Sequence, residues 1–260
     1  MNSNPTRHLI AVDVGNSALK VAVFAATEAV ALTRPLQVAR APHVAPLGRL
    51  ANQLPPAPCH WCVISVQRPM EARLAAWVRA HRPHDDYSLL TVHDFPLQVQ
   101  VELPERVGLD RLAAAVAANQ LRCHGQPAIV IDVGTAITVD LLDSEGAFRG
   151  GAILPGPAVA AAALAMRTDA LPHVDDVDLA RLPTPIGKST TAAIRSGVAW
   201  GTVGAVKELV FQMTRQLPAT PHLFCTGGGG AVIAEQLGAD AQYDPVLVLR
   251  GVAFAHTAET

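Results

Sequence analysis

This sequence of 260 residues has no excess of charge of either sign, because 20 Lys and Arg residues stand against 22 Asp and Glu residues and leave a net charge of −2. Electrostatic binding of nucleic acid or anionic lipid needs an excess of basic residues, so the composition argues against both partners. Half of the residues are hydrophobic, enough to bury the core of one large domain or of two domains of roughly 120 to 130 residues. The composition favours a globular protein that acts on a small neutral or anionic metabolite.

Long apolar runs are also lacking. The first seven residues are mostly polar, and Asp13 interrupts the apolar run that follows them. A signal peptide or a membrane-spanning helix needs a longer uninterrupted stretch, so neither is expected. We expect a cytoplasmic protein without a membrane partner.

Cysteine is scarce, and in a reducing compartment the four cysteines should be free thiols. Cys59 and Cys62 form a C-x-x-C, a spacing compatible with zinc or redox chemistry. A structural zinc site needs a second pair of ligands, and the neighbours Cys123 and His124 have the wrong spacing. The segment that begins at Cys62 is typical of a buried strand, so a core position is favoured for this cysteine; the fourth cysteine is Cys225.

One short pattern occurs twice in the sequence. Residues 10–20 resemble residues 129–139, and the two aspartates, Asp13 and Asp132, lie 119 residues apart. Each copy is an apolar run rich in β-branched residues, an Asp-x-Gly turn and a second such run, which predicts a β-hairpin. A period this long predicts two like domains rather than a solenoid.

The rest of the chain alternates predicted strands and helices, so we predict an α/β protein. The turn-forming segment 124–127 separates the halves and gives domains of residues 1–124 and 125–260. The elements expected besides the hairpins are a strand over 61–66, helices over 69–81 and 110–119, an Ala-rich helix ending near 166, a loop over 171–185, a long helix over 189–217, a strand over 223–225 with a short helix after it, and a last strand over 245–249.

The first hairpin turn has the features of a phosphate site. Gly15 lets the backbone approach a ligand, and consecutive N–H groups of residues 15–17 can surround phosphate oxygens. Asp13 suits a hydrated magnesium ion, and Lys20, five residues past the glycine, could reach a β- or γ-phosphate. The alternative is an ordinary hairpin whose Asn and Ser favour the turn.

The second copy strengthens the nucleotide interpretation. Asp132 and Thr135 supply another carboxylate and another hydroxyl in a turn, so two facing domains would present paired turns across a cleft. The glycine run within residues 226–230 follows a strand and offers a surface without Cβ atoms to adenine or ribose. Residues 187–189 resemble the end of a P-loop, but Leu182 stands where the P-loop requires its first glycine.

A group that could orient an acceptor hydroxyl lies at the head of the predicted helix 110–119. Asp110 could accept the hydroxyl proton, and Arg111 could hold an acceptor carboxylate by paired hydrogen bonds. A helix cap beside a solvated arginine is the alternative. Because phosphoryl transfer passes through a loose transition state, an aspartate of ordinary pKa would serve as the base.

Six short motifs follow one another in an order that resembles the type III pantothenate kinase family. They are Asp13–Lys20, Gly108–Arg111, Asp132–Thr138, Gly150–Gly156, Gly187–Thr190 and Thr226–Gly228. The resemblance covers nearly the whole chain. It implies two actin-like, ribonuclease-H-like domains with an interdomain nucleotide cleft. It also implies transfer of the ATP γ-phosphate to the primary hydroxyl of pantothenate, the first step of coenzyme A biosynthesis.

The resemblance implies roles for individual residues. ATP and magnesium would be bound by Asp13, Val14, Gly15, Asn16, Ser17, Ala18, Leu19, Lys20 and Thr135. Pantothenate would be held by Val101, Gly108, Leu109, Asp110, Arg111 and Thr190. Asp110 would be the catalytic base, and Asp132 would ligate the monovalent cation, potassium or ammonium, that this family uses. Val101 departs from the family pattern, because a tyrosine often stands there beside the substrate.

Two other functions stay open. One is a kinase of the same fold that phosphorylates a sugar or a short carboxylic acid, since fold alone does not fix the substrate. The other is a nucleotide-binding regulator without turnover. Asp110 argues against the regulator, because a protein that only binds a nucleotide does not need it.

The long predicted helix carries Gly197, Gly201 and Gly204. A glycine inside a helix costs about 1 kcal/mol relative to alanine, so three of them indicate a face that another backbone approaches closely. Close packing on the chain's own sheet and contact with a second subunit are both compatible with this. The family resemblance implies the second, a homodimer with the long helix at the two-fold contact and Thr190 near the partner's pantothenate pocket.

Overall fold

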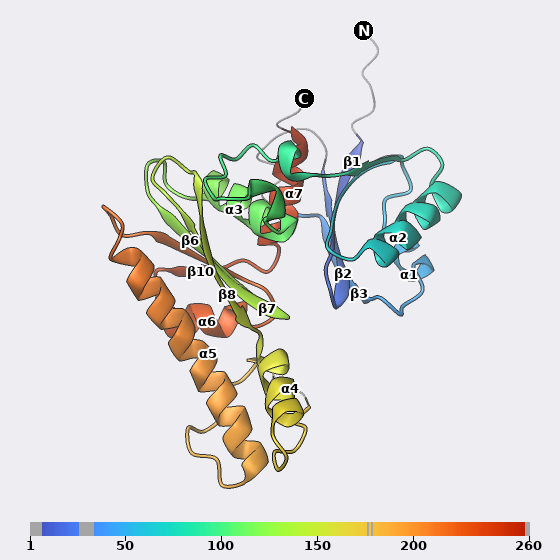
Figure 1. The fold of residues 1–260 in the computed structure, drawn as a ribbon. Helices are drawn as coiled ribbons and strands as arrows, with labels where there is room; N and C mark the ends of the chain where they lie inside the picture. The colour runs from blue at the N-terminus through green and yellow to red at the C-terminus, as the bar shows by residue number, and fades with distance from the viewer. Residues whose placement is uncertain (1–6, 26–33, 176, 178, 258–260) are drawn as a thin grey trace. The chain divides into compact units, whose positions relative to one another are not determined.

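The computed structural model describes residues 7–25, 34–175, 177 and 179–257. The chain forms two compact units, each built around one five-stranded sheet (Figure 1). The first unit comprises residues 1–97, 102–120 and 246–260, and the second comprises residues 98–101 and 121–245.

The sheet of the first unit has the strand order β3-β2-β1-β4-β5. Its strands are β1 (His8–Val14), β2 (Ala18–Phe24), β3 (Gln37–Pro42), β4 (Cys59–Ser65) and β5 (Asp86–Leu89). The first three form an antiparallel meander, and β4 and β5 continue the sheet in parallel with β1. This is the predicted hairpin extended on both sides.

Helices cover both faces of this sheet. The short α1 (Gly48–Ala51) and α2 (Arg68–His81) share a core with one face of β1 and β4. The C-terminal helix α7 (Leu247–Thr257) packs against β1, β2 and β4. Two 3-10 helices, Val92–Asp94 and Pro104–Arg106, precede α3 (Leu109–Leu121).

The second unit repeats this plan with the strand order β10-β9-β6-β7-β8. Its elements are β6 (Ala128–Val133), β7 (Ala136–Leu142), β8 (Phe148–Pro155), α4 (Pro157–Arg167), α5 (Thr190–Thr214), β9 (His222–Thr226), α6 (Gly230–Leu237) and β10 (Ala241–Tyr243). The strands β6, β7 and β8 are antiparallel, whereas β9 is parallel to β6 and β10 to β9. The helices α5 and α6 enclose a core with β6, β7 and β9 (Figure 1). The equal strand orders confirm the predicted duplication. In the described part of the chain, no helix is long and apolar enough to cross a membrane.

The C-terminal segment differs from its prediction. A strand was expected over 245–249, but α7 begins at Leu247, and the strand nearby is β10, which was not predicted. Nearly every residue from Val246 to Ala255 is buried, so this helix lacks the polar stripe that would distinguish it from a strand. Because α7 packs on β1, these residues belong to the first unit, whereas the sequence assigned them to a domain of residues 125–260.

Strand β4 places its two cysteines on opposite faces of the sheet. Side chains alternate along a strand, so Cys59 lies with Trp61 and Val63 in the core shared with α2, while Cys62 points to the other face. None of the four cysteines forms a disulfide, and Cys62 is fully buried, as predicted. The two thiols of the C-x-x-C therefore cannot bind one ion together.

Asp85, which follows α2, holds a buried polar cluster at the start of β4. Its carboxylate accepts hydrogen bonds from the Cys59 N–H at 3.0 Å, from the Trp61 indole at 2.8 Å and from Arg82 Nε at 2.7 Å. The side chains of Asp85 and Arg82 are only 2% and 15% exposed. The end of α2 is thus fixed to the beginning of β4.

The variant Asp85→Ala should lower the free energy of unfolding by about 3 kcal/mol or more, because it leaves a guanidinium and an indole N–H buried without their acceptor. Asp86→Ala is the matched control, since Asp86 is 57% exposed and pairs with the exposed Arg7. Such a surface pair contributes about 1 kcal/mol at most. Urea unfolding measures both variants, and equal losses would contradict the assigned role of Asp85.

Candidate functional site

In the first unit, the β1–β2 hairpin buries a carboxylate beside an ammonium group. Asp13, near the end of β1, lies directly across from Lys20 of β2 in the antiparallel register. Lys20 Nζ donates to Asp13 Oδ2 at 2.9 Å, and the Asp13 side chain is 7% exposed. Without this cation a carboxylate so deeply buried would strongly destabilise the fold.

The turn itself is short and its tip is open. The Gly15 N–H donates to the Ala18 carbonyl at 3.2 Å, and Asn16 and Ser17 are exposed between them. Val14, Ala18 and Leu19 were also predicted to bind ATP, but their side chains are buried in the core. Only the main chain of these three residues can meet a ligand.

His43 also contributes to the turn, although the sequence analysis did not single it out. It follows β3, and its Nε2 donates to the Gly15 carbonyl at 2.9 Å. A carbonyl oxygen only accepts, so the hydrogen bond fixes the protonated nitrogen. A single histidine 28 residues along the chain from Gly15 gave no sequence signal for this contact.

Asp110 lies in the first turn of α3 and joins this charged group. Burial raises the pKa of Asp110, and the negative charge of Asp13 raises it further, whereas the Arg111 N–H and the positive charges of Lys20 and Arg111 oppose the rise. Its Oδ1 accepts the Arg111 N–H at 2.9 Å. A Cβ atom on Gly108 would lie 2.5 Å from this oxygen, so any other residue there would displace the carboxylate. The structure therefore brings the predicted residues Asp13, Lys20 and Asp110 together.

A cavity of about 350 Å³ in the first unit reaches the residue that precedes Asp110 in the chain. Leu109, the neighbour of Asp110, lines it together with Val107. Arg68, in the first turn of α2, brings a guanidinium that the sequence analysis missed, because an arginine after a strand carries no motif. The cavity could admit a small acceptor beside Asp110.

In the second unit, the turn between β6 and β7 repeats the first turn with one residue fewer. The Gly134 N–H donates to the Ala136 carbonyl at 3.0 Å, as Gly15 does to Ala18. The shortening shifts the register, so the residue across from Asp132 is Thr138. Thr135 is exposed at the tip of the turn. This copy thus presents a carboxylate opposite a hydroxyl instead of an ammonium.

The glycine run after β9 packs against this turn. Gly227 has φ +82°, and a Cβ atom there would lie 2.3 Å from Asp132 Oδ1. The Gly229 N–H donates to the Val133 carbonyl at 3.1 Å. Gly227 and Gly229 are therefore required by the chain's own contacts, and Gly228, whose Cβ would meet no described atom within 4 Å, is the glycine open to a ligand.

The two remaining residues of the predicted pantothenate site belong to the second unit. Val101 lies beside β8, where its Cγ1 is 3.4 Å from the position of a Cβ on Gly150. Thr190 is the first residue of α5. Ser189 caps this helix, because its side-chain oxygen accepts a hydrogen bond from the Ala192 N–H at 3.2 Å. The other four predicted residues, Gly108, Leu109, Asp110 and Arg111, belong to the first unit.

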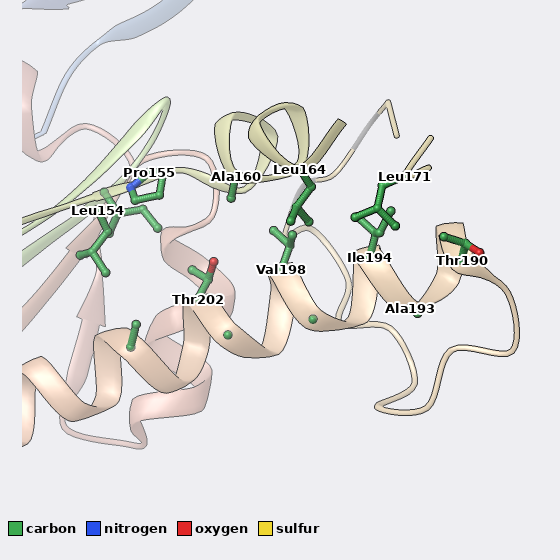
Figure 2. Close-up of a pocket in the computed structure, with 14 residues that line it drawn as sticks. Leu154, Pro155, Ala160, Leu164, Leu171, Thr190, Ala193, Ile194, Val198 and Thr202 are labelled. Atoms are coloured by element: carbon green, nitrogen blue, oxygen red, sulfur yellow. The ribbon is translucent and has the colours of Figure 1, made fainter. Parts of the chain in front are cut away.

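Thr190 lines an apolar cavity of about 620 Å³ between α4 and α5. Figure 2 shows Leu164 of α4 pointing toward Val198 of α5, and Leu171, which follows α4, lying next to Ile194. The hydroxyl of Thr190 lies at one end of this row (Figure 2). The cavity suits an apolar group.

The predicted glycines of α5 face open space. A Cβ atom on Gly197, Gly201 or Gly204 would meet no described atom within 4 Å. Close packing on the chain's own sheet, one of the two explanations left open by the sequence, therefore does not account for them. Gly197 and Gly201 also line the apolar cavity.

Comparison with known proteins gives one consistent family. The family model described as type III pantothenate kinase matches residues 9–212. A type III pantothenate kinase of Rhodopirellula baltica is 42% identical over 167 residues, which cover 63% of this chain and 59% of the relative. One of Listeria monocytogenes is 37% identical over 156 residues, which cover 60% and 58%. The chain thus matches less than two thirds of the length of these relatives.

Solved structures share the fold across the chain. A protein described as a Baf family transcriptional activator from Campylobacter jejuni has a TM-score of 0.57 at 18% identity and covers 97% of this chain and 98% of its own. A protein described as a 2-dehydro-3-deoxygalactonokinase from Sinorhizobium meliloti has a TM-score of 0.54 at 14% identity, with coverage of 97% and 99%. At these identities the likeness concerns the fold alone, and it confirms the predicted actin-like α/β fold of two related domains.

Proposed function

Because the chain belongs to the type III pantothenate kinase family, we propose that it transfers the γ-phosphate of ATP to the primary hydroxyl of pantothenate. The product would be 4'-phosphopantothenate, and the reaction would begin coenzyme A biosynthesis. The observation that carries this proposal is the buried carboxylate of Asp110 beside Asp13 and Lys20. A pure nucleotide binder has no use for such a carboxylate at the site of the phosphates.

Asp110 is the proposed catalytic base. It would accept the proton of the pantothenate hydroxyl, and its raised pKa makes it a better acceptor than an ordinary aspartate. Because the loose transition state of phosphoryl transfer asks little of the base, orientation of the hydroxyl is its main contribution. Gly108 supports this role by leaving room for the carboxylate.

The β1–β2 turn is the proposed ATP site. Lys20 and the N–H groups at Asn16 and Ser17 would bind phosphate oxygens, and Val14, Ala18 and Leu19 would contribute main-chain contacts only. Thr135 of the second unit would contact ATP as well. The buried Asp13 carboxylate suits a magnesium ion that keeps its water ligands. Magnesium supplies charge neutralisation at the β- and γ-phosphates when bound.

Arg111 is the proposed partner of the pantothenate carboxylate, since a guanidinium can bind both oxygens of a carboxylate at once. Gly108 and Leu109 would line the same region, Val101 would contribute to it, and Thr190 would be supplied by the second subunit of the dimer proposed below. Val101 offers an apolar contact where the family often has a tyrosine. The cavity beside Leu109 supports a small acceptor at this place.

The proposed activity is tested by ADP release from ATP with magnesium, potassium and a panel of hydroxyl acceptors. Pantothenate should give the highest kcat/KM. A sugar or a short hydroxy acid that exceeds pantothenate would assign the chain to another kinase activity on the same fold. ATP binding without phosphate transfer to any acceptor would indicate a regulator.

The variant Asp110→Asn should lower kcat by on the order of a hundredfold or more, while KM for ATP and the far-UV circular dichroism stay unchanged, because only the base is removed. The ADP-release assay with pantothenate measures this. Asp240→Asn, an exposed aspartate of the second unit, is the control and should keep the wild-type kcat. Wild-type turnover in Asp110→Asn would reduce Asp110 to a helix cap.

The same variant should be more stable than the wild type at neutral pH. The pKa of Asp110 is raised in the folded protein, so the folded state binds the proton more tightly than the unfolded state. Wild-type stability therefore falls as the pH rises from the ordinary aspartate pKa, about 4, through the raised value. Thermal unfolding should show an advantage of Asp110→Asn at about pH 8 that disappears at about pH 3.5. Equal stability at both pH values would contradict the raised pKa.

Asp132 is the proposed ligand of a monovalent cation, potassium or ammonium. The residue across from it in the register is the uncharged Thr138, whereas Asp13 faces the ammonium of Lys20. Backbone carbonyls near the turn are oxygen donors of the kind that such a cation prefers. Gly227 supports the arrangement, because its missing Cβ leaves space for the Asp132 carboxylate.

The variant Gly227→Ala should reduce activation by potassium, since the new Cβ would displace Asp132 Oδ1. An alanine held at the positive φ of residue 227 should also lower the free energy of unfolding by about 1–2 kcal/mol. Gly228→Ala is the matched control, because its Cβ meets open space. The measurement is the ratio of rates with and without potassium, and Asp132→Ala should abolish the activation with the fold retained. A wild-type enzyme indifferent to potassium and ammonium would contradict the assignment.

We further propose a homodimer in which α5 contacts the second subunit. The open glycines of α5 support it, since they leave a strip of helix backbone accessible to another chain. The apolar cavity between α4 and α5 lies along the same strip. Thr190, at its end, would then reach the partner's pantothenate pocket.

The variant Gly201→Leu should give a monomer with a raised KM for pantothenate, because the leucine side chain would occupy the strip that the partner approaches. Ala76→Leu, on an exposed position of α2, is the control and should stay dimeric. Sedimentation velocity at micromolar concentration distinguishes the two states. A wild-type protein that sediments as an active monomer would contradict the dimer.

A cytoplasmic location completes the proposal. All four cysteines are free thiols in the structure. Free thiols persist in reducing compartments, where ATP is also available. The location rests on this chemistry and on the proposed use of ATP.

A further inference from the structure

Two histidines and a cysteine meet on the face of the first sheet that α7 covers. His60 and Cys62 are two residues apart on β4, so their side chains share a face, and His256 comes from the last turn of α7. One ligand atom from each of the three lies within 4.8 Å of the others. The proposed phosphate site does not use any of these residues.

The donor set fits a borderline-soft metal ion. Imidazole nitrogens and a thiolate are the ligands that zinc prefers, whereas magnesium and calcium require oxygen. Cys62 is fully buried, and the two histidines are half-buried, so an ion can enter from the solvent side.

The surroundings hold the imidazole rings in place. His60 Nε2 lies 2.9 Å from Ser88 Oγ of the adjacent strand β5. The rings of His60 and His256 have centroids 4.2 Å apart and are inclined by 35°. Hydrogen bonds from neighbouring groups to ligand histidines are a regular feature of metal sites, because they fix the ring orientation.

We propose that His60, Cys62 and His256 bind one zinc ion, with water in the fourth position. Cys62 would bind as the thiolate and release its proton to solvent. The ion would join the end of α7 to β4 and so fasten the C-terminal helix to the sheet that carries Asp13. The proposal is independent of the kinase activity.

The test is a titration of the full-length reduced protein with Co²⁺ and with Zn²⁺ in competition. The wild type should bind one equivalent and show the near-ultraviolet absorption of a cobalt–thiolate bond. Cys62→Ser should lose this absorption, and His256→Asn should weaken zinc binding by at least about a hundredfold. Ser88→Ala should weaken it by about ten- to hundredfold, because it releases the ring without removing a ligand.

Cys59→Ser is the matched control, since Cys59 lies on the same strand but on the opposite face. It should keep the full cobalt absorption. Loss of the absorption in Cys59→Ser, or its retention in Cys62→Ser, would overturn the proposal. So would a wild type that binds no stoichiometric zinc.

Thermal unfolding gives a second readout that does not depend on absorption. Zinc should raise the midpoint of the wild type and of Cys59→Ser, and leave that of Cys62→Ser unchanged, because an ion that binds only the folded state stabilises it. Magnesium should have no such effect through this site. An equal zinc-induced rise in Cys62→Ser would assign the stabilisation to another site and overturn the proposal.

Discussion

Asp13 can be buried near the end of β1 because the antiparallel register of β1 and β2 puts the Lys20 ammonium directly across from it. A buried carboxylate without such a partner would be protonated or would destabilise the fold. The same pair sets the charge around Asp110, whose pKa rises with the charge of Asp13 and is held back by that of Lys20. Two strands and one helix therefore depend on a single hairpin register for the alignment of their charged groups.

The second hairpin pairs its aspartate with a different residue type from the first hairpin. The two units share a strand order, and both turns close with a glycine N–H to a carbonyl. Loss of one residue from the second turn puts Thr138 where an ammonium stands in the first. The charged partner of the first aspartate therefore has an uncharged counterpart in the second hairpin.

The sequence predicted what depends on local pattern and missed what depends on packing. The hairpins were predicted from apolar runs around two Asp-x-Gly turns, the duplication from the repeat of that pattern, and α2, α3 and α5 were expected close to where they occur. The run at 245–249 was predicted as a strand because a short apolar segment has no period of its own. The helix α7 found there is buried along most of its length, so no polar stripe marks its helical period. His43 reaches the β1–β2 turn, and Arg68 reaches the cavity beside Leu109, from distant segments without a motif. The C-x-x-C spacing was visible in the sequence, but only the alternation of β4 shows that its thiols point apart.

Glycine illustrates the same limit, because a sequence does not reveal why a glycine is needed. Gly227 and Gly229 look like a surface for a nucleotide, yet an added Cβ on either would collide with the chain itself. The glycines of α5 were equally compatible with packing against the chain's own sheet and with a subunit contact, and an added Cβ on Gly197, Gly201 or Gly204 would meet open space. Each glycine makes the helix less stable than an alanine would, and an alanine Cβ at these positions would not clash with the described chain. Their open strip runs beside an apolar cavity, and the exposed Ile153 and Met166 lie on the neighbouring elements β8 and α4. A second chain would cover a helix face of this kind, on which glycines leave the backbone accessible and the surrounding residues are apolar.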